Sequence, residues 1–257
     1  MKIENTTIIH PKAKVADSVE VGHYTIIDED VVIGEGVRIG HHCYLTGNTT
    51  IGKNCKIFSN SIIGEMPQDL KFKDEKTFLK IGDNNIIREF VTIHLGTEEG
   101  GKTTVIGNNN LIMAYSHIAH DCKIGDNVII ANAAMFAGHV HIEDNATIGG
   151  MVAIHQFVRV GRYAIIGGNS RVMQDIPPFS LAAGQPADVV GLNSIGLRRA
   201  NVSPEIRNTL KKAIKILFKS GLSTNHAIEE IEKNLPRLDE IIYLVNFVKT
   251  SERGVAR

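Results

Sequence analysis

Two histidines stand three residues apart in the stretch HIAHDC, as His117 and His120, and Asp121 directly follows the second. A histidine beside a carboxylate can act as a general base with a supporting group, because a neutral imidazole accepts a proton near neutral pH. The same residue types can bind a metal ion, or they can be solvated turn residues without a function. The elements that present this stretch decide between the three interpretations.

An aliphatic side chain recurs every six positions through most of the chain. A helix has a period near 3.6 and a half-buried strand a period of 2, so neither explains six. Six residues fit a short strand and a tight turn, and three such units close a coil of 18 residues with the aliphatic side chains inside. The repeated positions are Ile9, Val15, Val21, Ile27, Ile33, Ile39, Leu45, Ile51, Ile57, Ile63, Ile81, Ile87, Ile93, Ile106, Ile112, Ile118, Ile124, Ile130, Phe136, Ile142, Ile148, Ile154, Val160, Ile166 and Val172.

Two insertions interrupt this repeat. Residues 64–80 contain no hexad in phase, and residues 95–104 shift the phase by one residue and carry three glycines. Insertions in a solenoid become loops on one face, which is often the binding face. We therefore expect both loops to lie beside a functional site.

The hexads end at Pro177 and Pro178, which cannot extend a β-ladder, and an irregular stretch is expected next. Ser203 can cap a helix that has Pro204 in its first turn, and Gly221 can end it. Two further helices follow from the apolar spacing. The sequence thus predicts a mainly β chain, with a parallel β-helix of hexapeptide repeats over residues 1–190 and a small α-helical domain over residues 191–257. The apolar positions of the three helices are Ile206, Leu210, Ala213, Ile214, Leu217 and Phe218; Ile228, Ile231 and Leu235; and Leu238, Ile241, Ile242, Val245 and Val248.

The composition excludes several classes of protein. Lys and Arg total 28 and Asp and Glu total 28, so no net field favours nucleic acid or an anionic membrane. No apolar run is long enough for stable membrane insertion, and the first residues lack the apolar core of a signal peptide. Cys43, Cys55 and Cys122 show no CxxC spacing. These features predict a cytoplasmic protein without a disulfide framework or a zinc ribbon.

Stacking of residues 18 apart brings the candidate residues together. Asp121 should lie against His139, and His120 against Gly138, with Gln156 one coil further on. An isolated outward histidine on such a coil is most often a solvated turn residue. A group of five beside two insertions favours a function instead, and its members are His94, His117, His120, His139 and His155.

Seven stretches carry a resemblance to a known family: MPQDLKF, VTIHLGT, HIAHDC, FAGHV, GGMVAIHQF, QDIPPF and GLNSIGLRR. In this order and spacing, the chain resembles the UDP-N-acetylglucosamine O-acyltransferases of lipid A biosynthesis over its whole length. The resemblance implies a left-handed β-helix that needs no metal or cofactor. It also implies transfer of a (3-hydroxy)fatty acyl group from acyl carrier protein to the 3-position of the glucosamine of UDP-N-acetylglucosamine. A homotrimer with active sites between subunits is expected.

The same resemblance implies a role for individual residues. His120 is the general base, Asp121 supports it, and the backbone N–H of Gly138 donates to the oxyanion. Glycine at Gly168 leaves room for a longer acyl chain. The expected substrate-binding residues are Gln68, Asp69 and Lys71 on the glucosamine and phosphate, His94, His117 and His139 beside the base, and Gln156, Asn193 and Arg199 towards the nucleotide.

Three positions depart from the family pattern, namely Pro186, Ile195 and Ala200 on the nucleotide side. They leave N-acylation of a 3-amino UDP-sugar by the same base as an alternative. The sibling enzyme that N-acylates the next lipid A intermediate is disfavoured, because a large N-terminal domain would be expected before the hexads. A noncatalytic sugar-binding solenoid explains the repeats but not the grouped histidines.

A remote alternative is a zinc-dependent, carbonic anhydrase-like β-helix protein, with zinc on His117, His120 and a histidine of a neighbouring subunit. Cys122 is not expected to be a nucleophile, because a thioester donor is already activated. Acyl carrier protein is acidic and should dock on the basic face of the first long C-terminal helix. That face carries Arg207, Lys211, Lys212, Lys215 and Lys219.

Overall fold

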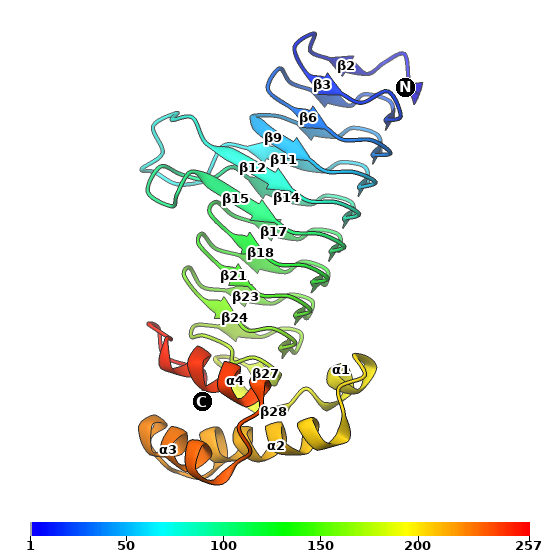
Figure 1. The fold of residues 1–257 in the computed structure, drawn as a ribbon. Coiled ribbons are helices and arrows are strands. Elements are labelled where there is room, and N and C mark those ends of the chain that lie inside the picture. The colour runs from blue at the N-terminus through cyan, green and yellow to red at the C-terminus, as the bar shows by residue number, and fades with distance from the viewer. Residues whose placement is uncertain (1) are drawn as a thin grey trace.

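The computed structural model describes residues 2–257 as a three-sided parallel β-helix with four helices at one end (Figure 1). Paired residues in regular coils lie 18 positions apart, as Ile27 and Leu45 do, so each coil contains three hexads. Three parallel sheets run along the sides of the prism. The fold class that the six-residue period predicts is confirmed.

The three sheets contain eleven, nine and eight strands. The first contains β1 (Lys2–Ile3), β4 (Glu20–Val21), β7 (Arg38–Ile39), β10 (Lys56–Ile57), β13 (Ile86–Ile87), β16 (Leu111–Ile112), β19 (Ile129–Ile130), β22 (Thr147–Ile148), β25 (Ile165–Ile166), β27 (Ser180–Gly184) and β28 (Ala187–Leu192). The second contains β2 (Ile8–Ile9), β5 (Ile26–Ile27), β8 (Tyr44–Leu45), β11 (Ile62–Glu65), β14 (Thr92–His94), β17 (His117–Ile118), β20 (Met135–Phe136), β23 (Ala153–Ile154) and β26 (Arg171–Val172). The third contains β3 (Lys14–Val15), β6 (Val32–Ile33), β9 (Asn48–Ile51), β12 (Phe78–Ile81), β15 (Thr103–Ile106), β18 (Lys123–Ile124), β21 (His141–Ile142) and β24 (Arg159–Val160).

The inward side chains of successive coils form one continuous column. Ile27, Ile63, Ile118 and Ile130 are each 0 % exposed. Burying such a side chain stabilises the fold by about 1.5–3 kcal/mol relative to leaving it in water. Because every coil contributes three such positions, stacking of aliphatic side chains replaces the large aromatic core that this chain lacks.

The two insertions leave the prism between adjacent sheets. They connect β11 to β12 and β14 to β15, and both project from the same edge (Figure 1). Regular coils pair residues 18 positions apart in the sequence. Across the first insertion this separation is 30 residues, as for Ile63 and Ile93, and across the second it is 25, as for Ile93 and Ile118. The column therefore continues without a gap while the extra residues become loops.

The expectation of an irregular stretch after Pro178 is wrong. β27 pairs in parallel with β25, and β28 turns back against β27 as an antiparallel strand that ends at Leu192. Pro177 and Pro178 lie in the turn before β27, where their missing N–H groups cost no ladder hydrogen bond. Sheet structure therefore continues past the last hexad and joins the β-helix to the helices.

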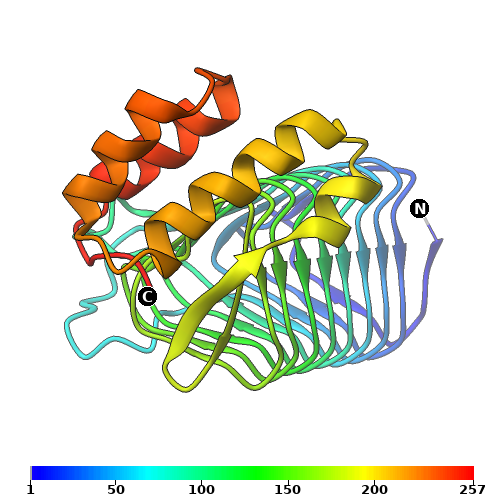
Figure 2. The same ribbon diagram turned by 90° about the horizontal axis from the view of Figure 1, so that it is seen from below.

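The helices cover the end of the β-helix opposite the N-terminus (Figure 2). They are α1 (Ser194–Arg199), α2 (Pro204–Lys219), α3 (Thr224–Asn234) and α4 (Asp239–Lys249). The Ile206 N–H donates to the Ser203 hydroxyl at 3.2 Å, which confirms the predicted cap of α2. Leu210, Ile214 and Leu217 of α2 pack into a second apolar cluster with Phe179. Within residues 2–257, no helix is long and apolar enough to cross a bilayer.

Candidate active site

His120 and Asp121 lie at the corner between β17 of the second sheet and β18 of the third. Asp121 and His139 occupy equivalent corner positions one coil apart, and both have left-handed backbones, with φ of 60° and 62°. The His139 N–H donates to the His120 carbonyl at 3.0 Å, which holds the two coils in register. The predicted stacking of Asp121 against His139 is therefore present.

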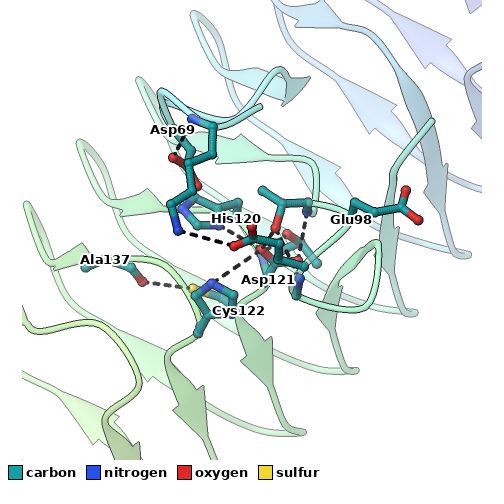
Figure 3. Close-up of polar contacts among 12 residues, drawn as sticks. Asp69, Glu98, His120, Asp121, Cys122 and Ala137 are labelled. Atoms are coloured by element: carbon teal, nitrogen blue, oxygen red, sulfur yellow. Dashed lines mark hydrogen bonds and ion pairs between the residues drawn. The ribbon is translucent and has the colours of Figure 1, made fainter. Parts of the chain in front are cut away.

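His120 and Asp121 form a hydrogen-bonded pair. Nδ1 of His120 lies 2.7 Å from Oδ2 of Asp121 (Figure 3). A carboxylate only accepts hydrogen bonds, so Nδ1 donates to it, and Nε2 is the ring nitrogen left for a substrate. The Asp121 side chain is 0 % exposed and that of His120 is 13 % exposed. The histidine of the pair is thus the member that a substrate can reach.

Asp121 is held by three further hydrogen bonds. The Thr97 N–H donates to Oδ1 at 2.8 Å, and the Thr97 hydroxyl donates to Oδ2 at 2.7 Å. The Asp121 N–H donates to the Thr104 hydroxyl at 2.8 Å. Burial alone would raise the pKa of Asp121, but the donors from His120 and Thr97 outweigh it, so this pKa lies below its ordinary value. Asp121 is therefore ionised and fixed in orientation.

Gly138 leaves the space that the His120 ring occupies. A Cβ at this glycine would lie 2.4 Å from Cε1 and 2.6 Å from Nε2 of His120. Within residues 2–257, no protein oxygen accepts a hydrogen bond from the Gly138 N–H. The residue that packs on the His120 ring therefore has a backbone donor that could serve a forming oxyanion.

Three more histidines surround the pair. The rings of His94 and His117 pack edge to face with their centroids 4.7 Å apart. The rings of His120 and His139 pack in the same way, with centroids 5.2 Å apart. His139 also stacks on Phe157 at 4.4 Å. Burial is the main cause that lowers the pKa of His117 and of His139, so both rings are neutral at neutral pH.

His94 differs from the expected outward position, because it is only 3 % exposed. Its Nδ1 has no hydrogen-bond partner within residues 2–257. Burial, followed by the nearby His117 and His120, lowers the pKa of His94 from 6.5 to about 4. The insertion after β14 therefore leaves this histidine inside the site rather than on its surface.

The low pKa of His94 predicts a pH-dependent stability. The unfolded chain takes up this proton as the pH falls through 6.5, whereas the folded protein resists until about 4, so stability is lost on acidification. We expect the free energy of unfolding to fall by about 2 kcal/mol between about pH 7 and pH 5 because of this residue. Urea unfolding of wild type and His94→Gln measures it. An equal fall in both proteins would contradict the prediction.

The first insertion lies beside the second. Asp69, Lys71 and Thr97 line a shallow pocket of ≈ 280 Å³ between the two loops. Lys71 is 73 % exposed and its Nζ lies 3.4 Å from a carboxylate oxygen of Glu99. Gln68 is exposed. The predicted loop residues Asp69 and Lys71 thus line the same pocket as Thr97 of the second insertion.

Asn193 and Arg199 lie on another face of the prism. Together with Ile195 they line a groove of ≈ 530 Å³ over the outer surface of the first sheet. The Asn193 amide caps α1 through Gly196 and donates to the Tyr163 carbonyl at 2.8 Å. Within one chain these nucleotide-side candidates are therefore separated from the His120 corner.

Gln156 and Gly168 are both exposed. Gln156 follows β23 at the same corner as His120, two coils on. A Cβ at Gly168 would approach the Gly150 carbonyl oxygen at 3.2 Å, and the surface around it is otherwise open. Nδ1 of His155 lies 3.2 Å from the carbonyl oxygen of Gln156.

Comparison with known proteins gives the family. Residues 175–256 match the model of UDP-N-acetylglucosamine O-acyltransferase domain 2, and residues 103–138 match the bacterial transferase hexapeptide repeats. The acyl-acyl-carrier-protein–UDP-N-acetylglucosamine O-acyltransferase of Thermodesulfovibrio yellowstonii is 53 % identical, covering 100 % of this chain and 99 % of that protein. This chain belongs to the UDP-N-acetylglucosamine O-acyltransferase family. The resemblance drawn from the seven motifs is confirmed.

Solved structures agree with this membership. LpxA from Acinetobacter baumannii has a TM-score of 0.94 at 43 % identity, covering 99 % of each chain. LpxA from Bacteroides fragilis has a TM-score of 0.96 at 43 % identity, also covering 99 % of each chain. Full-length agreement includes the helical end of this acyltransferase as well as its β-helix.

The same corner of this acyltransferase holds a group of residues with the chemistry of metal ligands. His120, Asp121 and His139 offer ligand atoms within 4.8 Å of one another, which differs from the His117 and His120 set of the zinc alternative. The Asp121 carboxylate already accepts three hydrogen bonds. They come from Nδ1 of His120, the Thr97 hydroxyl and the Thr97 backbone N–H. A cation would have to displace these hydrogen bonds.

Cys122, next to the pair, is 0 % exposed and its thiol donates to the Ala137 carbonyl at 3.3 Å (Figure 3). Burial raises its pKa to about 12. The thiolate is therefore scarce at neutral pH, which agrees with the expectation that this cysteine is not a nucleophile. All three cysteines are free and buried.

Sequence reasoning missed two contacts of the site. It did not single out Thr97, although this residue is the last of the matched stretch VTIHLGT. It also missed Thr92, whose hydroxyl lies 2.7 Å from Nδ1 of His117 and directs the other ring nitrogen of that histidine away from the strand. Both contacts join residues of neighbouring coils, so the six-residue spacing alone does not predict them.

Proposed function

We propose that this protein transfers a (3-hydroxy)fatty acyl group from acyl carrier protein to the 3-hydroxyl of the glucosamine of UDP-N-acetylglucosamine, the first step of lipid A biosynthesis, with His120 as general base. One observation carries the mechanism. The Asp121 carboxylate holds His120 through Nδ1 at 2.7 Å, which leaves Nε2 for the substrate on a ring that packs against Gly138.

The chemistry proceeds without a covalent enzyme intermediate. Nε2 of His120 takes the proton of the 3-hydroxyl as this oxygen attacks the thioester carbon. The Gly138 N–H donates to the resulting oxyanion, and collapse breaks the C–S bond while the imidazolium returns its proton to the leaving thiolate. A positioned base contributes about 10²–10⁴-fold and one oxyanion donor about 10²–10³-fold.

The remaining candidates would orient the acceptor and donor. Neutral His117 and His139 can donate or accept hydrogen bonds with the sugar without the repulsion that two imidazolium ions would add beside a forming charge. Asp69 and Lys71, at the mouth of the pocket, suit the glucosamine and the phosphates. Open space at Gly168 suits a longer acyl chain.

A homotrimer would complete the site. Asn193 and Arg199 line the groove over the first sheet, whereas His120 lies at the corner between the other two sheets. In a closed ring about a threefold axis, the first sheet of one subunit can face the His120 corner of the next. The apolar groove floor of Ile129 and Ile165 supports such a contact.

Acyl carrier protein would supply the donor in the cytoplasm. The basic side chains Lys211, Lys212, Lys215 and Lys219 of α2 are exposed, which supports docking of an acidic partner. N-acylation of a 3-amino acceptor remains the second candidate, because Nε2 of His120 could accept a proton from either group.

The test is acyl transfer by the purified wild-type protein. A series of 3-hydroxyacyl and unhydroxylated acyl carrier proteins would be offered with UDP-N-acetylglucosamine or its 3-amino analogue, and products identified by mass spectrometry. We expect an ester of UDP-N-acetylglucosamine, formed at the same rate with and without EDTA. No product with either acceptor from a folded trimer would sink the acyltransferase proposal, and loss of activity on chelation would favour the zinc alternative.

A further inference from the structure

The second insertion reaches Asp121 through Thr97. The backbone N–H and the hydroxyl of this one residue donate to different oxygens of the carboxylate, at 2.8 and 2.7 Å. Thr97 is 5 % exposed and Asp121 is 3 % exposed. Two buried donors from a single residue fix the plane of the carboxylate as well as its position.

A tight turn presents these donors. The Gly100 and Lys102 N–H groups donate to the Thr97 carbonyl at 3.2 and 2.8 Å. A Cβ at Gly100 would lie 2.0 Å from Cγ of Asp121, so the backbone of the turn packs directly on the carboxylate. Glu98 points its own carboxylate away from Asp121 in Figure 3. The turn thus excludes water from Asp121 without adding a second negative charge against it.

Orientation of Asp121 decides which nitrogen of His120 is basic. Oδ2 accepts from both the Thr97 hydroxyl and Nδ1 of His120, each at 2.7 Å. Without the hydroxyl, the carboxylate can rotate about its remaining contacts, and the His120 ring is free to exchange its two tautomers. A supporting group of this kind acts by holding the correct tautomer and ring orientation.

We propose that Thr97 is a positioning residue for the general base, and that the turn Thr97–Gly100 keeps Asp121 aligned on Nδ1 of His120. This inference deepens the proposed function and rests on it. It assigns the second insertion a part in the reaction at the base itself, in addition to its place at the mouth of the substrate pocket.

Two variants of Thr97 test the hydroxyl. Thr97→Val removes it with little change of shape, and Thr97→Ser keeps it. We expect Thr97→Val to lower kcat by about 10–100-fold with KM for the sugar nucleotide changed less than about threefold, and Thr97→Ser to restore most of kcat. The acid limb of the pH profile of kcat/KM should move to lower pH in Thr97→Val, because a carboxylate that rotates away from Nδ1 stabilises the His120 imidazolium less.

Two glycine variants test the turn independently. Gly100→Ala places a methyl group against Asp121, whereas Gly101→Ala meets no heavy atom within 4 Å but has a φ of +89°. We expect Gly100→Ala to lose kcat as Thr97→Val does, and Gly101→Ala to lower the melting temperature while retaining kcat. Full activity of both Thr97→Val and Gly100→Ala, beside an active wild type, would overturn the inference.

A measurement without substrate separates this inference from the reaction itself. ¹⁵N NMR of the labelled His120 ring should show the Nδ1–H tautomer in wild type and a mixture in Thr97→Val. Should wild type transfer no acyl group, the proposed function fails while the tautomer result still decides the role of Thr97. An unchanged tautomer in Thr97→Val contradicts that role.

Discussion

His120→Gln is expected to lower kcat for acyl transfer by about 10³-fold, with a change in KM for UDP-N-acetylglucosamine of less than about fivefold. Glutamine has a similar bulk and can still form hydrogen bonds, but it cannot take up the proton of the 3-hydroxyl. Because the attacking oxygen must lose this proton, the loss should fall on the chemical step. Steady-state rates with a fixed acyl carrier protein donor measure both constants.

His226→Gln is the matched control, because it makes the same substitution at an exposed position of helix α3. It should leave kcat unchanged, while circular dichroism and gel filtration show the same fold and assembly for both variants. The general-base assignment fails if His120→Gln retains more than about a tenth of wild-type kcat in a folded protein.

Gly138→Ala is expected to abolish most activity through displacement rather than removal of the base. The new methyl group would stand 2.4 Å from Cε1 of His120, closer than real Cβ contacts allow, so the imidazole must turn away. Both the free N–H of Gly138 and Nε2 of His120 would then be misplaced relative to the thioester carbon. We expect kcat to fall by about 10²–10³-fold.

Gly22→Ala controls for the general cost of an alanine between coils. Its Cβ would lie 2.7 Å from the Gly40 carbonyl, at a coil remote from the site. We expect this variant to lower the melting temperature without changing kcat, and Gly138→Ala to change kcat by far more than Gly22→Ala. Equal kcat values in the two variants would show that Gly138 only maintains the coil.

The β-helix was predictable because its physics is local and repeated. An aliphatic residue such as Ile118 is in phase with neighbours six positions away, and the same requirement for a buried column acts on every coil. The stacking of His120 against Gly138 followed from the same arithmetic. Helix α2 was predictable as well, because Ser203 and Pro204 are local signals.

The segment after Pro178 was wrongly expected to be irregular because strand pairing there is not periodic. β27 lengthens the first sheet by contact with β25, and β28 pairs only with β27. Such pairing depends on which sheet edge is free in the folded protein, and the hexad spacing does not predict a free edge. The burial of His94 likewise depends on how the second insertion folds over the coil.

The sequence by itself determined the parallel β-helix, the helical end, the family and the identity of the candidate base. Each of these rests on a repeat or on a motif that is contiguous along the chain. Only the tertiary structure decided that Thr97 and Gly100 enclose Asp121, and that Asn193 lies on a different face from His120. Those relations join residues from separate coils and loops, and they are set by side-chain packing and hydrogen-bond geometry that spacing alone does not specify.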